Sequence, residues 1–301
     1  MKNSKSSLLR AKAAVAIDAS SDPAQGGMVM DNPVYVLGHS DGELERLRIQ
    51  SRFVEPITRQ FFQEAGIGTG MRVLDVGSGA GDVAFLTADL VGETGEVIGT
   101  DKAAAALTTA RQRAAAKGLH NVSFQAGDPT ELTFDRPFDA VVGRYVLLFQ
   151  ADPAAMVRAL MKQHLRPGGL IVFQEPDWTN VRSFPPAPSY DRCCQWIVEA
   201  FRGAGSDTNA ANNLYTAFAG AGLPSPQMRM QTFVGGSAGC TAWVQVVAGL
   251  AASLLPTMEQ LGIATAEDLE IATLAQRLQQ EVAASEHMII GRSEIAAWSR
   301  L

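Results

Sequence analysis

A glycine-rich turn followed by an acid is the part of the sequence best suited to chemistry. The turn is Val73-Leu74-Asp75-Val76-Gly77-Ser78-Gly79-Ala80-Gly81-Asp82, placed between a predicted strand and a predicted helix. Glycines in such a turn let the backbone approach a ligand closely, and the turn aims amide groups at that ligand. Asp101 follows the next predicted strand, about 20 residues after the last glycine, where a carboxylate can accept hydrogen bonds from both hydroxyls of a ribose. The turn and the acid together predict a nucleoside-binding site.

The acids within this turn narrow the class of ligand. A nicotinamide-binding turn follows G-x-G-x-x-G and would need glycine at position 82, where this chain has Asp82. A Tyr-x-x-x-Lys pair is also missing from its expected place, so a nicotinamide-dependent reductase is disfavoured. Asp75 lies two residues before the first glycine, where its carboxylate can fix the turn and face the amine of an amino-acid-bearing ligand.

Alternating strands and helices must position these residues. The pattern predicts strands at 72–76, 96–100, 122–126, 138–142 and 169–174, and helices at 83–90, 103–117 and 153–164. This alternation predicts an α/β fold with a parallel sheet covered on both faces. After Pro176 the sequence is mostly helical and Ala-rich, with strand-like runs at 227–233 and 294–300.

Five short segments occur in order along this alternating region. They are residues 73–81, Gly99-Thr100-Asp101, Gln125-Ala126-Gly127-Asp128, Phe138-Asp139-Ala140-Val141-Val142 and Leu165-Arg166-Pro167-Gly168-Gly169. Together they resemble the ordered motifs of class I S-adenosylmethionine-dependent methyltransferases, of the small-molecule type found in bacterial natural-product synthesis. The resemblance runs from about residue 71 to 175 and implies S-adenosylmethionine as the cofactor.

The resemblance also implies the architecture. It predicts a Rossmann-like, seven-stranded, mostly parallel sheet whose last strand, at 294–300, is antiparallel, with an inserted helical lid. We expect a disordered tail over residues 1–30 and N-terminal lid helices over 31–70. An S-adenosylmethionine-binding core would follow over 71–176, and 177–301 would supply the substrate lid and the closing strands.

Position by position, the resemblance assigns parts of the cofactor to residues of this chain. The glycines of the turn would line the methionine part, Asp101 would hold the ribose, and Arg144 would lie beside the sulfonium. The full set of implied cofactor-binding residues is Asp75, Gly77, Gly79, Gly81, Asp101, Lys102, Gly127, Asp128, Pro129 and Arg144.

Candidates for a general base are few. His39 lies in Tyr35-Val36-Leu37-Gly38-His39-Ser40, just before a predicted helix that Ser40 and Glu43 would cap. We expect His39 to be the base and Tyr35 to be a lid or base group; the alternative is that both only cap and pack the helix entry. Glu175, after the fifth predicted strand, is a third catalytic candidate, with the alternative that an acid there holds a neighbouring loop.

Candidate residues for binding the acceptor lie at the carboxyl edge of the predicted sheet, beside the cofactor residues. Tyr145 and Trp178 are the predicted substrate-binding residues, and Arg144 has the alternative role of an ion pair with Glu175 or Asp177. Aromatic residues in the helical segments favour an aromatic or heteroaromatic secondary-metabolite acceptor. The predicted function is small-molecule C-, N- or O-methylation by in-line transfer; the alternative is a non-catalytic module that only binds S-adenosylmethionine or S-adenosylhomocysteine.

Composition restricts the partners and the compartment. The chain has 25 Lys and Arg against 31 Asp and Glu, and its net charge of -6 does not favour a nucleic-acid partner. The fourth predicted strand is followed by Gly143-Arg144-Tyr145-Val146 and not by the motif of DNA methyltransferases. The three cysteines have no zinc spacing, so we expect no metal and a reducing, cytoplasmic setting. The apolar run at 240–255 is broken by Pro256 and predicts a buried helix, not a membrane span. Apolar faces of the inserted helices could pack within one chain or across a homodimer.

Overall fold

The protein is described by a computed structural model that covers residues 41–284 and 287–301. These residues fall within one unit, Asn32–Leu301. His39, Tyr35 and Ser40 lie outside the described residues. The predictions made for them therefore stay predictions.

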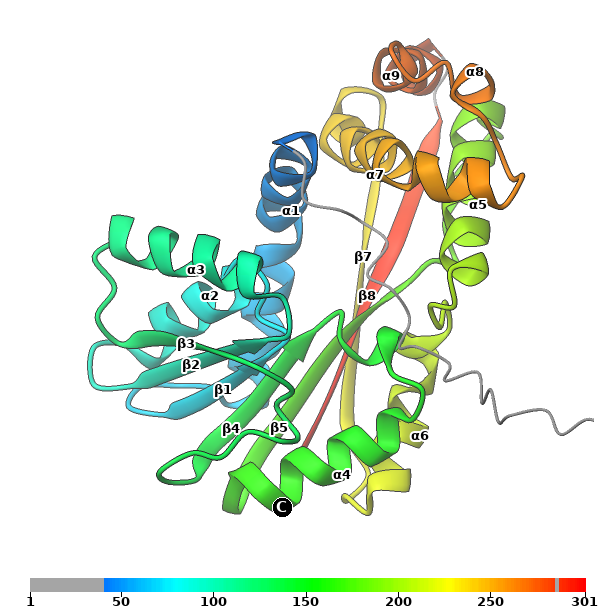
Figure 1. The fold of residues 1–301 in the computed structure, drawn as a ribbon. Coiled ribbons are helices and arrows are strands. Elements are labelled where there is room, and N and C mark those ends of the chain that lie inside the picture. The colour runs from blue at the N-terminus through cyan, green and yellow to red at the C-terminus, as the bar shows by residue number, and fades with distance from the viewer. Residues whose placement is uncertain (1–40, 285–286) are drawn as a thin grey trace, which may run out of the picture. The chain divides into compact units, whose positions relative to one another are not determined.

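The core of the described chain is one eight-stranded sheet (Figure 1). Its order is β3-β2-β1-β4-β5-β8-β6, and β7 pairs with the other side of β8. The strands β1 to β5 are parallel, and β8 is antiparallel to β5. The strands are β1 (Arg72–Val76), β2 (Glu96–Asp101), β3 (Val122–Ala126), β4 (Phe138–Arg144), β5 (Leu165–Asp177), β6 (Arg182–Phe184), β7 (Gln227–Gly236) and β8 (Met288–Arg300).

The helices follow the predicted alternation as far as β5 and then occur in two groups, α5–α6 and α7–α9, which β7 separates. The α-helices are α1 (Asp41–Ala65), α2 (Asp82–Val91), α3 (Ala104–Ala116), α4 (Pro153–His164), α5 (Pro188–Gly203), α6 (Ala210–Ala221), α7 (Thr241–Gln260), α8 (Ala266–Leu269) and α9 (Leu274–Ala284). Two 3-10 helices, η1 (Leu147–Phe149) and η2 (Ser237–Cys240), follow β4 and β7.

The predicted α/β fold with a mostly parallel sheet and an antiparallel closing strand is confirmed. The described residues contain eight strands rather than the seven expected. The difference arises because β8 begins at Met288 and not at position 294, and its first residues pair with the short β6. Three residues followed by Pro185 give too short a pattern to be recognised as a strand in the sequence.

Both faces of the sheet are buried, which explains the apolar runs in its parallel strands. Along β1, Leu74 and Val76 point to one face and pack with residues of α4 and α6. Val73 points to the opposite face and packs with residues of α1 and α2. α1 continues through Pro56 as one helix.

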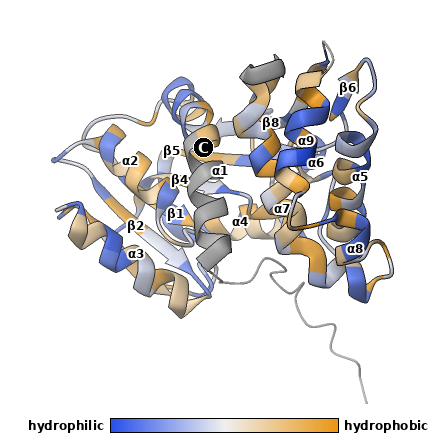
Figure 2. Cartoon of the chain, turned by 90° about the horizontal axis from the view of Figure 1, so that it is seen from above, coloured by the Kyte–Doolittle hydropathy of each residue, from blue (hydrophilic) through white to orange (hydrophobic). Residues whose placement is uncertain are grey.

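A separate apolar cluster lies among α5, α7 and α9. At its centre is the fully buried Trp243, whose indole N–H donates a 2.7 Å hydrogen bond to the hydroxyl of Tyr190. α7 is long and apolar enough to span a membrane by length and composition (Figure 2). Half of its apolar stretch is buried within the protein. Its place in this cluster agrees with the prediction of a buried helix.

Replacing Phe173 in the middle of β5 is expected to destabilise the fold strongly. Its side chain is fully buried against both the sheet and α6, so Phe173→Ala should lower the free energy of unfolding by about 3–5 kcal/mol. Phe184→Ala removes the same side chain at a position that is 69% exposed and should change stability by only about 0.5 kcal/mol or less. Urea denaturation of both variants checks the difference, and equal losses would contradict the assigned core.

Candidate functional site

The turn between β1 and α2 is closely packed except at its middle glycine. Gly77, Gly79 and Gly81 have φ angles of 66°, 52° and 92°, which side chains rarely adopt. A Cβ at Gly77 would lie 2.8 Å from Val146, and one at Gly81 would lie 2.7 Å from Phe85. A Cβ at Gly79 would meet no atom within 4 Å, so the turn is open to a ligand at this residue.

Asp101 at the end of β2 binds directly to this turn. Its Oδ2 accepts a 2.9 Å hydrogen bond from the backbone N–H of Gly79, and its Oδ1 accepts one of 2.8 Å from Ala103. The structure therefore brings together the glycine turn and the acid that the sequence paired. The carboxylate fixes the shape of the turn and lies beside its open position.

Asp75 is a buried carboxyl group whose oxygens make no hydrogen bond of ordinary geometry among the described residues, although the backbone amide of Ala84 acts to lower its pKa. The residue is fully buried. Burial raises the pKa of Asp75 well above its usual value, and the charge of Arg144 acts in the opposite direction. A buried polar group of this kind requires an explanation, and a cationic group of a ligand is one that fits its chemistry.

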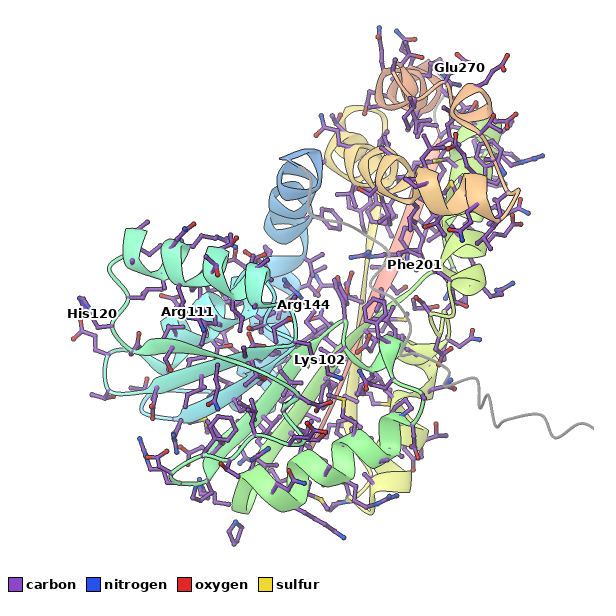
Figure 3. All side chains as sticks on the ribbon, viewed as in Figure 1. Lys102, Arg111, His120, Arg144, Phe201 and Glu270 are labelled. Atoms are coloured by element: carbon purple, nitrogen blue, oxygen red, sulfur yellow. The ribbon has the colours of Figure 1, made fainter. Side chains whose placement is uncertain are left out.

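Arg144 ends β4 near the centre of the carboxyl edge of the sheet (Figure 3). Its Nη1 donates a 3.0 Å hydrogen bond to the hydroxyl of Thr58 in α1. No ion pair joins it to Glu175 or Asp177, so the alternative role predicted for this arginine is not observed. Among the side chains that the structure describes, at residues 53–236, 239–284 and 287–301, the guanidinium has no carboxylate partner.

The residues after β2 and β3 form a small polar cluster. Lys102 Nζ lies 2.8 Å from Asp128 Oδ2, while Asp128 Oδ1 accepts hydrogen bonds from the amide and hydroxyl of Thr130. Burial acts to raise the pKa of Asp128, but these hydrogen bonds hold it below its usual value. The adjoining Gly127 has a φ of 137°, and the carbonyl of Pro129 lies 2.6 Å from Nε2 of His164.

Glu175 is positioned to hold the loop after β4. Its Oε1 accepts hydrogen bonds of 3.0 Å and 2.7 Å from the amides of Val146 and Leu147. The side chain is fully buried, and burial raises its pKa to about 8. These contacts are those of the loop-holding alternative, and a catalytic role for Glu175 stays a prediction. Asp177 acts similarly on the next loop, accepting from the amide and hydroxyl of Thr179.

Tyr145 directly follows β4 and has an unusual backbone conformation, with φ at 61°. Its amide donates a 2.9 Å hydrogen bond to the carbonyl of Gln174. Its hydroxyl lies 2.8 Å from both carboxylate oxygens of Glu294 and accepts a 2.6 Å hydrogen bond from Arg292 Nη2. The predicted substrate-binding tyrosine is thus tied to the closing strand.

Arg292 and Glu294 were missed by the sequence analysis. Arg292 Nε donates to Glu294 Oε1 at 2.9 Å, and Gln174 Nε2 donates to Glu294 Oε2 at 2.8 Å. The guanidinium also lies 5.5 Å from the ring centre of Trp178, the other predicted substrate-binding residue. The only indication in the sequence is that these two charges interrupt a mostly apolar stretch from Met288 to Trp298.

Aromatic side chains gather beside this network. Trp178 and Trp243 have ring centres 5.9 Å apart, and Phe53 of α1 lies 5.7 Å from Trp243. Phe233 of β7 lies 5.4 Å from Phe53. We call Phe53, Trp178, Phe233 and Trp243 the aromatic cluster.

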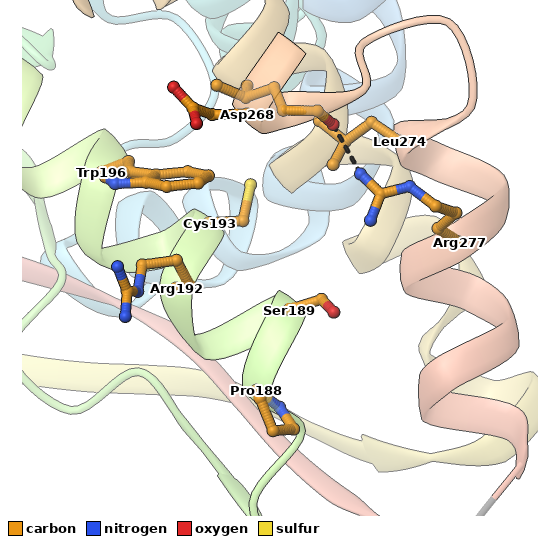
Figure 4. Close-up of a pocket in the computed structure, with 9 residues that line it drawn as sticks. Pro188, Ser189, Arg192, Cys193, Trp196, Asp268, Leu274 and Arg277 are labelled. Carbon is orange, nitrogen blue, oxygen red and sulfur yellow. Dashed lines mark hydrogen bonds between the residues drawn. The ribbon is translucent and has the colours of Figure 1, made fainter. Parts of the chain in front are cut away.

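A separate hollow of about 280 Å³ lies between α5 and the α8–α9 segment (Figure 4). Arg192, Cys193, Trp196 and Arg277 are among its lining residues, and none of the predicted site residues lines it. Arg277 is already paired with Glu270 and donates to the carbonyl of Leu269. Within the described residues, no group of three or more His, Cys, Asp or Glu side chains is arranged to hold a metal ion.

Glu175→Gln is expected to remove a pH-dependent loss of stability. The pKa of this carboxyl is about 8 in the folded protein and 4.5 ordinarily, so between these values the unfolded chain binds fewer protons. Stability therefore falls as the pH rises from about 4.5 to about 8. Glutamine keeps an oxygen for the amides of Val146 and Leu147 but cannot ionise.

Urea denaturation between pH 5 and pH 9 tests this prediction. The stability of Glu175→Gln relative to wild type should increase across the window and level off above about pH 8. The exposed Glu93→Gln is the control and should follow wild type throughout. Parallel pH curves for Glu175→Gln and wild type would contradict the raised pKa.

Comparisons with known proteins agree with this arrangement. The model of a family described as a methyltransferase domain matches residues 67–219. Aklanonic acid methyltransferase DauC of Streptomyces sp. (strain C5) is 35% identical over 150 residues, which cover 50% of this chain and 66% of that protein. Ubiquinone/menaquinone biosynthesis C-methyltransferase UbiE of Cellvibrio japonicus is 34% identical over 130 residues, covering 42% of this chain and 52% of that protein.

The fold comparison extends further along the chain than the sequence matches. The crystal structure of the YcgJ protein from Bacillus subtilis superposes with a TM-score of 0.53 at 19% identity, covering 83% of this chain and 99% of that one. The match to the family model spans half of the chain and includes the glycine turn, Asp101, Asp128 and the end of β4. The chain therefore belongs to the class I S-adenosylmethionine-dependent methyltransferase family.

Proposed function

We propose that the protein transfers a methyl group from S-adenosylmethionine to a planar, oxygen-bearing aromatic or quinol-type small molecule. The observation that carries this proposal is the open position at Gly79, bordered by Asp101 and by the buried, unpartnered carboxyl of Asp75. Such an edge can receive a nucleoside that also carries an amino-acid group.

The charges at this edge complement the two ends of such a ligand. Asp75 would bind the amine and Arg144 the carboxylate of the methionine part, since neither has an oppositely charged hydrogen-bond partner in the described chain. Asp101 would hold the ribose. Gly127, Asp128 and Pro129 would border the adenine, with Lys102 keeping Asp128 in place through their ion pair.

S-adenosylmethionine, when bound, supplies an electrophilic methyl group. The acceptor nucleophile would bond to the methyl carbon while the carbon–sulfur bond breaks and its electron pair moves to sulfur. The acceptor proton would pass to a base or to solvent. The protein has to orient the acceptor and exclude water. Glu175 contributes by fixing the loop after β4, and His39 and Tyr35 remain our proposals for the base and the lid.

The acceptor class is argued from Tyr145 and the partly exposed rings of the aromatic cluster, Phe53 and Phe233, with the buried Trp178 and Trp243 packed behind them. These side chains come from α1, β7, α7 and the loops after β4 and β5, and rings of this kind favour contact with a flat acceptor. The names of relatives mention ubiquinone, menaquinone and aklanonic acid, which supports the same class. We further propose that residues 71–176 hold the cofactor, and that 31–70 and the helices within 177–301 cover the acceptor.

Gly79→Ala should weaken cofactor binding and lower the free energy of unfolding by no more than Gly118→Ala does. Alanine is strained by roughly 1–2 kcal/mol in a left-handed conformation, and Gly118→Ala is a matched control because Gly118 also has a positive φ and open space around it. Calorimetric titration with S-adenosylhomocysteine should show at least about a tenfold loss of affinity for Gly79→Ala only. Equal affinities of the two variants would place the cofactor elsewhere.

Methyl transfer itself can be tested with isotopically labelled S-adenosylmethionine and a panel of naphthohydroquinones, phenols, indoles, amines and carboxylic acids. The proposal predicts label on a hydroquinone or phenol, read by mass spectrometry, at a rate at least about a hundredfold above the mixture without protein. Label only on amines or indoles would overturn the acceptor class. No label on any compound, with S-adenosylhomocysteine still bound, would favour the module that only binds.

A further inference from the structure

We infer that Arg292 and Glu294 of β8 are positioning residues for methyl transfer, which act by holding Tyr145 between the cofactor side and the acceptor side of the site. This inference rests on the proposed function for its catalytic consequence. Its structural part concerns only the contacts among Tyr145, Arg292, Glu294 and Gln174.

The conformation of Tyr145 requires support from its surroundings. A bulky residue with φ at 61° is an outlier, and such conformations persist where neighbouring groups determine them. Here the backbone amide is bound to the carbonyl of Gln174, and the hydroxyl is bound by Glu294 and Arg292. Both ends of the residue are therefore fixed.

The group that holds the hydroxyl is buried and charged. The side chains of Arg292 and Glu294 are 5% and 1% exposed. A buried ion pair is often no more stabilising than apolar residues of similar size, so a contribution to stability is a weak explanation for it. What this pair supplies is a fixed position for the phenol, with Gln174 completing the hydrogen bonds of the carboxylate.

Tyr145 itself is unsuited to act as a base. Burial and the charge of Glu294 raise the pKa of its phenol far above the usual value, although the charges of Arg292 and Arg144 oppose this. Its hydroxyl is also already occupied by the two β8 residues. The ring is the part left to act on a ligand or on neighbouring residues.

The ring lies within a row of alternating cations and aromatic rings. The guanidinium carbon of Arg144 is 5.6 Å from the centre of the Tyr145 ring, and that of Arg292 is 5.1 Å from it. Arg292 is in turn 5.5 Å from the ring of Trp178, which belongs to the aromatic cluster. The row joins Arg144, proposed to bind the cofactor, to the wall proposed for the acceptor, so a shift of Tyr145 changes the spacing between the two.

Steady-state kinetics of Glu294→Ala, Glu294→Gln and Tyr145→Phe test the catalytic part, using the acceptor that the labelled-methyl panel identifies. Glu294→Ala should lower kcat at least about thirtyfold while changing the KM for S-adenosylmethionine by no more than about threefold. Glu294→Gln should recover most of the loss, because its carbonyl oxygen can accept from Tyr145 and Arg292. The added N–H groups of this glutamine also need an acceptor. Gln174 can turn its side-chain amide so that Oε1, which has no partner in the described chain, accepts from them.

A double-mutant cycle separates joint action from two independent effects. If Glu294 acts through the hydroxyl of Tyr145, the two substitutions remove the same contact. The kcat of the double variant Tyr145→Phe/Glu294→Ala should then lie within about twofold of the kcat of the slower single variant. Multiplicative losses, or an unchanged kcat in Glu294→Ala, would overturn the inference. Glu96→Gln, which removes ion pairs with Arg72 and Arg136 at the opposite edge of the sheet, is the control and should keep wild-type kcat.

A crystal structure of Glu294→Ala with S-adenosylhomocysteine gives a test that needs no acceptor. We expect Tyr145 to leave the positive-φ conformation or its ring to leave the row between Arg144 and Arg292. If Glu294→Ala does not fold, Glu294→Leu with the same readout replaces it. An unmoved Tyr145 would refute the positioning role even if methyl transfer were confirmed, and a moved Tyr145 would support it even if the acceptor panel failed.

Discussion

The hydrogen bond from the Gly79 amide to Asp101 is the contact on which the arrangement of the site depends. It joins the ends of β1 and β2 across 22 residues of sequence and fixes the open part of the turn. From there the contacts continue along the sheet edge. Gly77 lies against Val146, whose amide is held by Glu175 of β5, and the preceding Tyr145 is held by β8. Five neighbouring strands thus share one continuous set of contacts at the edge of the sheet where the parallel strands end.

Buried carboxyl groups along this edge have different partners and therefore different properties. Asp75 makes no hydrogen bond of ordinary geometry in the described chain, Glu175 binds two amides, and Glu294 binds a tyrosine, a glutamine and an arginine. Burial raises the pKa of Asp75 and of Glu175, and their few partners only partly oppose it. Asp75 is the one that a cationic ligand group would complete, while Glu175 and Glu294 serve the loop and the tyrosine. A single sheet edge can in this way separate cofactor binding from support of the acceptor wall.

The sequence was sufficient for the parts of the fold that have local patterns. The bounds of β1, β3 and α4 agree with the predicted ranges, because local patterns mark them: an apolar run in β1, alternation before Gly127 in β3, and a proline at the start of α4. β6 and the first residues of β8 could not be recognised, since their pairing is between distant segments and neither has a regular alternation. Pairing across the sheet also explains why Arg292 and Glu294 were missed: an i, i+2 pair of charges on a strand predicts an exposed face unless a third residue from elsewhere buries it. Glu175 was found as a candidate, but its loop contacts depend on the tertiary fold.

Titration of the wild-type protein with S-adenosylhomocysteine, followed by calorimetry, most directly tests whether this edge is a cofactor site. The account predicts one molecule bound per chain with a dissociation constant of about 10 μM or lower, a free energy near -7 kcal/mol or more favourable. Absence of binding at concentrations of about 1 mM, which limits the binding free energy to about -4 kcal/mol, would contradict it.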